Sequence, residues 1–267
     1  MSKKPWQLQV FKKSIKKKEK LRLLQKNLDI DPSMIILDLG CAQGILSFFL
    51  RQKGGFWVHT DHDFENLKTS QGLLEKNLLQ LSEGPLPFKS ESFDLVISLD
   101  YLEHLENDGQ CLEEIHRILK KDGRLVLATP RTGKFLTLQK LRPALGISLE
   151  FYGHKREGYS LEELEKKLLK AHLQVQKNKT FSRFFSEFLE LLINFLYIKF
   201  LSRRVQTTGK LRDGHIRPST SQEFTTQKKT FKLYSFFYPL VWLITRLDKV
   251  LFFQRGYGLI VWARKIP

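Results

Sequence analysis

The sequence is poor in cysteine and has no long apolar run. Its 267 residues contain two cysteines, Cys41 and Cys111, which are too few for a disulfide framework and do not show zinc-finger spacing. We therefore expect a reducing compartment. A membrane-spanning helix needs about 20 consecutive apolar residues, and no segment supplies them cleanly. The amino-terminal segment also lacks the apolar stretch of a secretory signal.

Acidic residues are scarce relative to basic ones, and the imbalance is confined to particular segments. The chain has 28 Asp and Glu against 45 Lys and Arg, which gives a formal net charge of +17. Residues 1–29 carry a net charge of +8 and residues 199–232 carry +7, whereas residues 30–198 are nearly neutral. Basic segments attract a polyanion, either nucleic acid or the anionic surface of a membrane. Composition alone does not choose between these partners.

The middle of the chain alternates short apolar runs with amphipathic segments. Four runs have the composition of buried parallel strands: residues 34–39, 56–60, 93–98 and 124–129. Residues 110–120 and 161–171 are predicted helices, and a capping box from Ser160 to Glu163 opens the second. Strands separated by single helices imply a parallel sheet covered on both faces. We therefore predict an α/β, doubly wound domain.

A glycine-rich turn, Gly-Cys-Ala-Gln-Gly at residues 40–44, follows the first predicted strand. Ligands of parallel sheets bind beyond the carboxyl ends of the strands, where small residues let the backbone turn sharply and approach the ligand. Asp61 follows the second predicted strand, at the position where a carboxylate accepts the hydroxyls of a ribose. A tight turn without a cofactor and an exposed loop acid are the plainer alternatives.

Several ordered motifs carry a resemblance to one family. They are Asp38-Leu-Gly-Cys-Ala-Gln-Gly44, Leu86-Pro-Phe88, Ser92-Phe-Asp-Leu-Val96, Leu102-Glu-His-Leu105, and the segment from Glu114 to Val126. With them, residues 30–182 and a last strand resemble the class I S-adenosylmethionine-dependent methyltransferases, a group that includes ubiquinone- and menaquinone-pathway enzymes. The resemblance implies S-adenosyl-L-methionine as cofactor. It also implies a Rossmann-like sheet of seven strands whose last strand is antiparallel.

The resemblance further assigns residues to the cofactor. Asp61 would bind the ribose, and the methionine part would lie against Asp38, Gly40, Ala42 and Gly44. Ala42 stands where a third glycine is common, and its methyl group is tolerable if its φ stays negative. The adenine-binding acid is not plainly present, and two residues are alternatives for it: Ser82 and Glu83. The predicted cofactor site also includes Cys41, His62 and Ser98.

Candidates for catalysis follow the fourth predicted strand. Methyl transfer needs in-line positioning and, for some acceptors, a base that takes a proton. His104 is one candidate base and His154 is another. Asp100, Glu103 and His104 resemble the cluster that binds a divalent metal in ubiquinone-pathway O-methyltransferases. Because Leu-Glu-His also occurs in relatives without metal, we predict no metal and keep these three residues as the alternative.

The chain departs from the family between the predicted sixth and seventh strands, residues 173–180 and 258–264. About 75 residues intervene where a short hairpin is usual. Because the sixth strand is parallel to the others, this insertion leaves from the active-site edge of the sheet and can cap the substrate pocket. Residues 181–201 and 233–244 are rich in aromatic residues, as in helices that lie in a membrane interface. The alternatives are a lid packed on the sheet and a homodimer face.

These patterns divide the chain into three parts. We predict a basic N-terminal helix at residues 1–29, a methyltransferase domain at residues 30–182 plus 254–267, and an amphipathic, membrane-interfacial helical cap at residues 183–253. The predicted function is methyl transfer to an apolar or lipid-linked acceptor, a quinone precursor or an envelope lipid. The enzyme would be cytoplasmic and peripheral on the inner face of a membrane. The alternatives are an RNA methyltransferase and a non-catalytic membrane or assembly factor, and segregation of aromatic from charged runs favours the lipid.

Overall fold

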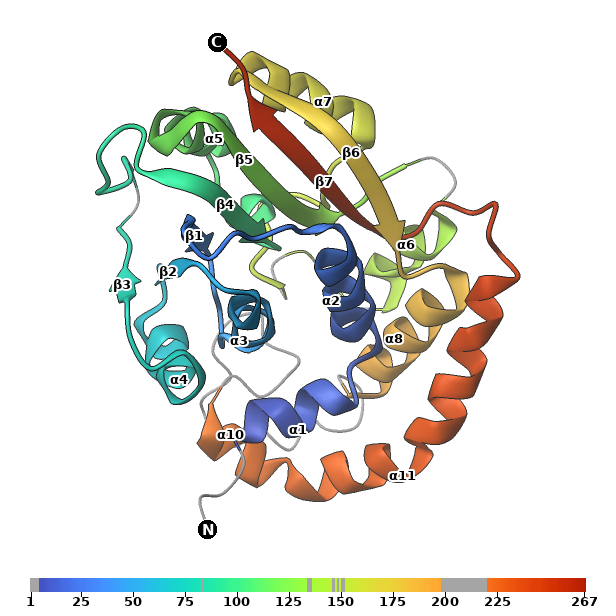
Figure 1. The fold of residues 1–267 in the computed structure, drawn as a ribbon. Helices are drawn as coiled ribbons and strands as arrows, with labels where there is room; N and C mark the ends of the chain where they lie inside the picture. The colour runs from blue at the N-terminus through green and yellow to red at the C-terminus, as the bar shows by residue number, and fades with distance from the viewer. Residues whose placement is uncertain are drawn as a thin grey trace.

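The computed structural model describes residues 5–82, 84–133, 136–145, 147, 149, 152–197 and 220–267. Seven strands form one sheet in the order β3-β2-β1-β4-β5-β7-β6 (Figure 1). β7 is antiparallel to β5 and β6, and the other neighbours pair in parallel. The strands are β1 Ile35–Leu39, β2 Phe56–Asp61, β3 Leu78–Gln80, β4 Phe93–Leu99, β5 Leu119–Pro130, β6 Leu173–Phe181 and β7 Gly258–Lys265. The predicted fold class, an α/β Rossmann-like sheet with an antiparallel last strand, is confirmed.

Helices cover both faces of this sheet (Figure 1). They are α1 Trp6–Lys12, α2 Ile15–Asn27, α3 Ile45–Leu50, α4 Phe64–Leu74, α5 Asp108–Ile118, α6 Thr137–Leu141, α7 Leu161–Lys170, α8 Phe184–Tyr197, α10 Ser221–Thr226 and α11 Lys228–Thr245. Short 3-10 turns are η1 Arg51–Lys53, η2 Leu102–His104, η3 Pro143–Leu145 and η6 Arg246–Lys249. Side chains alternate along β1, so that Leu37 joins the core under α5 and α7, and Ile36 joins the core under α2, α3 and α4.

Local signals in the sequence place most of these elements correctly. The capping box before α7 is confirmed, because the Ser160 hydroxyl accepts the backbone N–H of Glu163 at 3.1 Å. The predicted helix over residues 110–120 instead ends at Ile118, since Leu119 already pairs with Phe93 in the sheet. The three-residue strand β3 was not among the predicted strands, because it is too short to show a periodicity.

The basic N-terminal segment folds against the domain as two helices. The prediction of one basic helix is wrong, because α1 ends at Lys12 and α2 begins at Ile15. Leu24 of α2 is fully buried in the core below the sheet, and Lys20 on the same helix is only 4% exposed. The sequence predicted that the basic residues of this segment bind a polyanion. At least one of them, Lys20, is instead buried inside the molecule.

The insertion between β6 and β7 packs on these N-terminal helices as well as on itself. Figure 1 shows α11 curving around the α1 and α8 side of the molecule, with Pro239 inside the helix. The two halves of the insertion meet at the buried Asp248, which accepts the backbone N–H of Phe185 at 2.8 Å at the start of α8. Trp6 of α1 stacks on Phe224 of α10 with ring centres 5.5 Å apart. Most of the basic segment at residues 199–232 lies outside the described residues.

Glu187 joins three separate parts of the chain. This carboxylate of α8 is 2% exposed and lies 2.6 Å from Nζ of Lys16 on α2. It also accepts a hydrogen bond from the guanidinium of Arg142, directly after α6, and one from the Ser182 hydroxyl at 3.3 Å. A buried carboxylate with two cationic partners holds α2, α6 and α8 together.

Glu187→Gln tests this arrangement. Removing this buried charge leaves the Arg142 guanidinium without its ion pair, while Lys16 keeps Glu190 at 3.4 Å. We expect the free energy of unfolding to fall by about 3 kcal/mol. Urea unfolding followed by circular dichroism measures this difference. Glu113→Gln on the exposed face of α5 is the control, with an expected change below about 0.5 kcal/mol. Equal stability of the two variants would show that Glu187 does not hold these helices.

Candidate cofactor and catalytic site

The loop after β1 has a shape that requires small residues. Gly40 has a φ of +82° and Gly44 a φ of +74°. A Cβ on Gly40 would lie 2.4 Å from the Tyr101 ring, and one on Gly44 would lie 2.9 Å from Leu74. Ala42 also has a positive φ of +48°, so the condition under which its methyl group would be tolerated without strain is not met. An alanine in this left-handed region is strained by about 1–2 kcal/mol, which the surrounding contacts must offset.

Asp61, the last residue of β2, supplies that contact. Its Oδ2 accepts the backbone N–H of Ala42 at 2.7 Å, and its Oδ1 accepts the backbone N–H of Asp63 at 2.9 Å and Nδ2 of Asn66 at 3.2 Å. Asp61 is 3% exposed. A carboxylate has roughly four lone-pair positions, so these partners leave it little further capacity. Asp61 holds the glycine loop, and its predicted contact with a ribose stays a prediction.

Asp38 and Cys41 support the loop from within the sheet. Oδ2 of Asp38 lies 2.8 Å from Nδ1 of His59, the residue opposite it on β2, and both side chains are buried. The backbone N–H groups of Gly40 and Cys41 both donate to the carbonyl oxygen of Thr60. Burial raises the pKa of the Cys41 thiol far above neutrality. The thiol is therefore protonated and unreactive, and direct contact of Asp38 or Cys41 with a cofactor stays a prediction.

The other predicted cofactor residues lie around the same edge of the sheet. His62 directly follows β2, is largely exposed, and has its ring centre 6.3 Å from that of Tyr101. Ser98 is buried near the end of β4, opposite Leu39 of β1. Ser82 is exposed in the loop after β3, whereas Glu83 lies outside the described residues. Each described residue is at or near the carboxyl end of a neighbouring strand.

A lysine from the N-terminal helices also reaches this edge. Nζ of Lys20 forms an ion pair with Asp100, directly after β4, and lies 5.3 Å from the centre of the Phe181 ring. Burial opposes ionisation of Asp100, but the charge of Lys20 holds its pKa below the ordinary value. The sequence analysis missed Lys20 because it lies in a run of lysines. Its distance of four residues from the buried Leu24 was the available signal.

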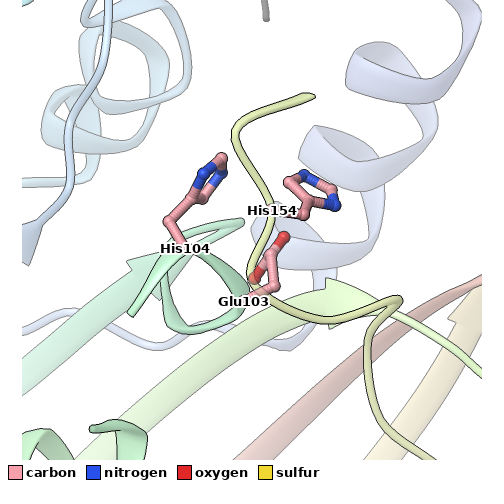
Figure 2. Close-up of side chains that lie close together, drawn as sticks. All are labelled: Glu103, His104 and His154. Atoms are coloured by element: carbon pink, nitrogen blue, oxygen red, sulfur yellow. The ribbon is translucent and has the colours of Figure 1, made fainter. Parts of the chain in front are cut away.

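Three side chains converge beside this pair (Figure 2). One potential ligand atom each from Glu103, His104 and His154 lies within 4.8 Å of the others. The rings of His104 and His154 are perpendicular, with centres 4.7 Å apart. The structure thus brings together both candidate bases. Sequence analysis gave Asp100, Glu103 and His104 as the alternative metal ligands, and in the structure His154 takes the place of Asp100 in this group. These donors suit a divalent metal, and the expectation of no metal stays a prediction.

Glu103 is a fully buried carboxyl group with one unpartnered oxygen. Its Oε2 lies 3.3 Å from the Thr129 hydroxyl, and its Oε1 has no hydrogen-bond partner within the described part of the chain. Burial, and then repulsion by Asp100, raises the pKa of Glu103 to about 8. Glu103 is therefore mostly protonated at neutral pH and can donate a hydrogen bond or a proton.

The two histidines have different roles in proton chemistry. Nδ1 of His104 lies 3.0 Å from the carbonyl oxygen of Gly153. Because a carbonyl only accepts, this Nδ1 carries the hydrogen and Nε2 carries the lone pair of the neutral ring. Burial, and then the neighbouring His104, lowers the pKa of His154 to about 4. Either histidine can act as a base when its ring is neutral. For His104, the contact with Gly153 assigns the lone pair to Nε2.

Comparison with known proteins identifies the domain that holds this site. Residues 37–127 match a family model described as a methyltransferase domain. A ubiquinone biosynthesis O-methyltransferase of Pelagibacter ubique is 27% identical over 129 residues, 47% of this chain and 52% of that protein. An 18S rRNA (guanine(1575)-N(7))-methyltransferase of Saccharomyces cerevisiae is 31% identical over 132 residues, 46% of each chain. Residues 37–127, about a third of the chain, are therefore a methyltransferase domain.

The rest of the chain is less well matched than the methyltransferase domain. A solved structure from Thermotoga maritima, described as a possible histamine N-methyltransferase, aligns with a TM-score of 0.59 over 97% of this chain and 93% of that one. At 15% identity this likeness shows the fold alone. The chain spans about half the length of the two curated relatives. One of them is named for ubiquinone biosynthesis and the other for ribosomal RNA, so the family does not determine the acceptor.

The cofactor of this family, S-adenosylmethionine, fits the loop in one testable respect. The left-handed backbone at Gly40 and Gly44, packed against Tyr101 and Leu74, gives a tight turn in which only glycine fits at these two positions. Asp61 fixes that turn through Ala42. The methyltransferase domain therefore has a preformed loop at the position where the family binds its cofactor.

Glu103→Gln tests the raised pKa. The folded protein keeps a proton on Glu103 that the unfolded chain releases above about pH 4.3, so stability falls as pH rises toward 8. We expect wild type to lose up to about 1.4 kcal/mol per pH unit relative to the variant between roughly pH 5 and pH 8. Urea unfolding at several pH values measures the difference. The opposite effect of His154 below about pH 6.5 is present in both proteins and cancels. Parallel curves would contradict the assignment.

Proposed function

We propose that the chain is a S-adenosylmethionine-dependent methyltransferase that acts on an apolar or lipid-linked acceptor at a membrane surface. The cofactor, when bound, supplies a methyl group carried on a sulfonium. The glycine loop and Asp61 would hold it, and Nε2 of His104 would take the proton from an acceptor hydroxyl or amine. Protonated Glu103 would donate to an acceptor oxygen beside it. The chemistry needs little more than this positioning.

The acceptor class rests on an exposed apolar stripe that runs along α11 and into η6. Its members recur at helical spacing and are 46–76% exposed: Leu233, Phe236, Phe237, Leu240, Leu243 and Leu247. The opposite side of α11 packs inward, where Tyr234 donates to the carbonyl oxygen of Lys13 at 2.8 Å and Tyr238 is buried. α8 adds Phe188, Leu192 and Leu196, each at least 40% exposed. An apolar stripe of this extent on a water-soluble surface indicates a binding face.

Charge beside the stripe favours an anionic membrane as its partner. Exposed basic residues flank it at both ends: Lys228, Lys229, Lys232, Arg246 and Lys249. An apolar face with flanking cations is the pattern of a helix lying in the membrane interface. Among the described helices, none is long and apolar enough to cross a membrane. The proposal therefore includes peripheral attachment on the inner, cytoplasmic face, rather than a lid or homodimer face alone.

RNA methylation is the second candidate, favoured by the net charge and by the ribosomal RNA relative. Two observations weigh against it. Lys16 and Lys20 of the basic N-terminal segment are engaged in ion pairs within the molecule. The exposed aromatic side chains on α11 form one stripe instead of alternating with the cations, as stacking on bases would require. A non-catalytic factor with this fold would fail the cofactor test that follows.

Asp61→Ala tests the cofactor site. We expect S-adenosylmethionine to bind at least tenfold more weakly by calorimetry, because the glycine loop loses the hydrogen bond that holds it at Ala42. Asp63→Ala is the control, because Asp63 caps α4 through Glu65. It should lower stability by about 1 kcal/mol and leave cofactor affinity nearly unchanged. No binding to wild type would sink the enzyme proposal, and unchanged affinity in Asp61→Ala would remove Asp61 from the site.

Sedimentation with anionic vesicles tests the membrane face. A triple variant with Phe236, Leu240 and Leu243 changed to Ser should bind at least tenfold more weakly, because each buried apolar side chain contributes about 1.5–3 kcal/mol. The control changes three exposed apolar residues elsewhere to Ser: Phe56, Phe64 and Leu169. It should bind like wild type. A wild-type chain that stays in solution at low salt would contradict the proposal.

A further inference from the structure

A cavity of about 380 Å³ opens at the junction of the sheet and the insertion, apart from the glycine loop and from Glu103. It lies where β5 and β6 end and β7 begins, beside the first residue of α7. Beside the lining residue Arg255, Gly256 packs closely on the end of β6, where a Cβ would lie 2.1 Å from the carbonyl oxygen of Phe181.

Four cationic side chains line this cavity: Arg131, Lys179, Arg183 and Arg255. They come from three segments, the ends of β5 and β6 and the turn before β7, and none lies within 4.0 Å of a carboxylate oxygen of the described residues. Burial, and then the charge of Arg255, lowers the pKa of Arg131, which shows that two like charges face each other. Two acids partly offset them: Glu162 at the start of α7 faces Arg131 and Arg255, and Glu19 of α2 faces Arg183. With four cations and two facing acids, the cavity keeps a net positive charge.

Two of the guanidinium groups are held in place by backbone carbonyls. Nε of Arg183 donates to the carbonyl oxygen of Gln254 at 3.0 Å, and Nη1 of Arg131 donates to that of Gly256 at 3.5 Å. Each group thus has further N–H donors left for a ligand. Guanidinium groups fixed in this way suit the tetrahedral oxygens of a phosphate.

Two exposed aromatic residues stand at the mouth of the cavity. Phe252 is 79% exposed and Phe253 is 71% exposed, and both line it. Val250 and Leu247, at 67% and 46% exposed, connect them along the chain to the stripe on α11. A polar, cationic interior therefore opens directly onto an apolar surface.

We propose that this cavity binds the phosphate of an anionic lipid headgroup, with Phe252 and Phe253 in the acyl region beside it. The proposal deepens the membrane attachment and rests on it, because a lipid of a bilayer reaches the cavity only when the insertion lies on that bilayer. A lipid fits better than a nucleic acid, because the aromatic rim continues into an apolar surface instead of a basic groove. The bound headgroup would fix the orientation of the methyltransferase domain on the membrane.

Calorimetry of the full chain with dihexanoyl phosphatidic acid, a water-soluble short-chain lipid, tests the site directly. The double variant Arg183→Gln, Arg255→Gln should bind at least roughly tenfold more weakly, because charge-assisted hydrogen bonds to the phosphate are lost. Lys121→Gln, Lys170→Gln is the control for charge, since both lysines are exposed and lie outside the cavity lining. It should bind like wild type. Equal affinity of the two double variants would overturn the proposal.

Two further ligands separate the source of the phosphate. Inorganic phosphate that binds as tightly as the lipid would overturn the lipid assignment, and so would a short single-stranded RNA that displaces the lipid.

Vesicle sedimentation separates this site from the membrane face. Wild type that binds the short-chain lipid but ignores vesicles would contradict the membrane proposal and leave the cavity assignment supported. The reverse result would overturn the cavity assignment alone. In that case the α11 variant loses vesicle binding, and the two double variants bind the short-chain lipid equally well.

Discussion

The burial of α2 lysines against carboxylates is the interaction on which the rest of the structure depends. Lys16 pairs with Glu187 of the insertion, and Lys20 pairs with Asp100 at the end of β4. The N-terminal helices lie outside the hydrogen-bonded sheet. These ion pairs and the buried Leu24 therefore fix their position. Through them, one helix closes the site on one side and anchors α8 on the other. The net charge of +17 consequently has two parts, one inside the fold and one on its surface.

The same pairing controls the electrostatics of the site. Lys20 keeps Asp100 ionised, and the ionised Asp100 repels a second negative charge on the buried Glu103. One carboxyl group is therefore charged and the other neutral at the same pH, which separates their chemical roles. His154 is held neutral close by, with His104 beside it. A site of this kind offers a buried proton donor, Glu103, beside a half-buried acceptor, His104.

Local patterns were sufficient for much of the fold. The apolar runs predicted the parallel strands, and the glycine turn predicted the edge at which they end. The position of Asp61 at the end of β2 was also predictable, because each of these features depends on residues close together in the sequence. Long-range contacts were not predictable in this way. The strained Ala42 needs Asp61 to hold it, and His154 enters the cluster from a loop about 50 residues away. For Lys20 the only signal in the sequence was its distance of four residues from Leu24, and its ion pair with Asp100 depends on the folded chain.

The central claim is that a methyltransferase domain acts on an apolar acceptor at a membrane. The most direct test supplies the purified chain with S-[methyl-³H]adenosylmethionine and with membranes and total RNA from the source cells. Organic extraction then separates labelled lipid from labelled nucleic acid. Tritium in the organic phase that appears only with active chain is the predicted result. Tritium confined to the RNA fraction, or no transfer to either fraction, would contradict the account.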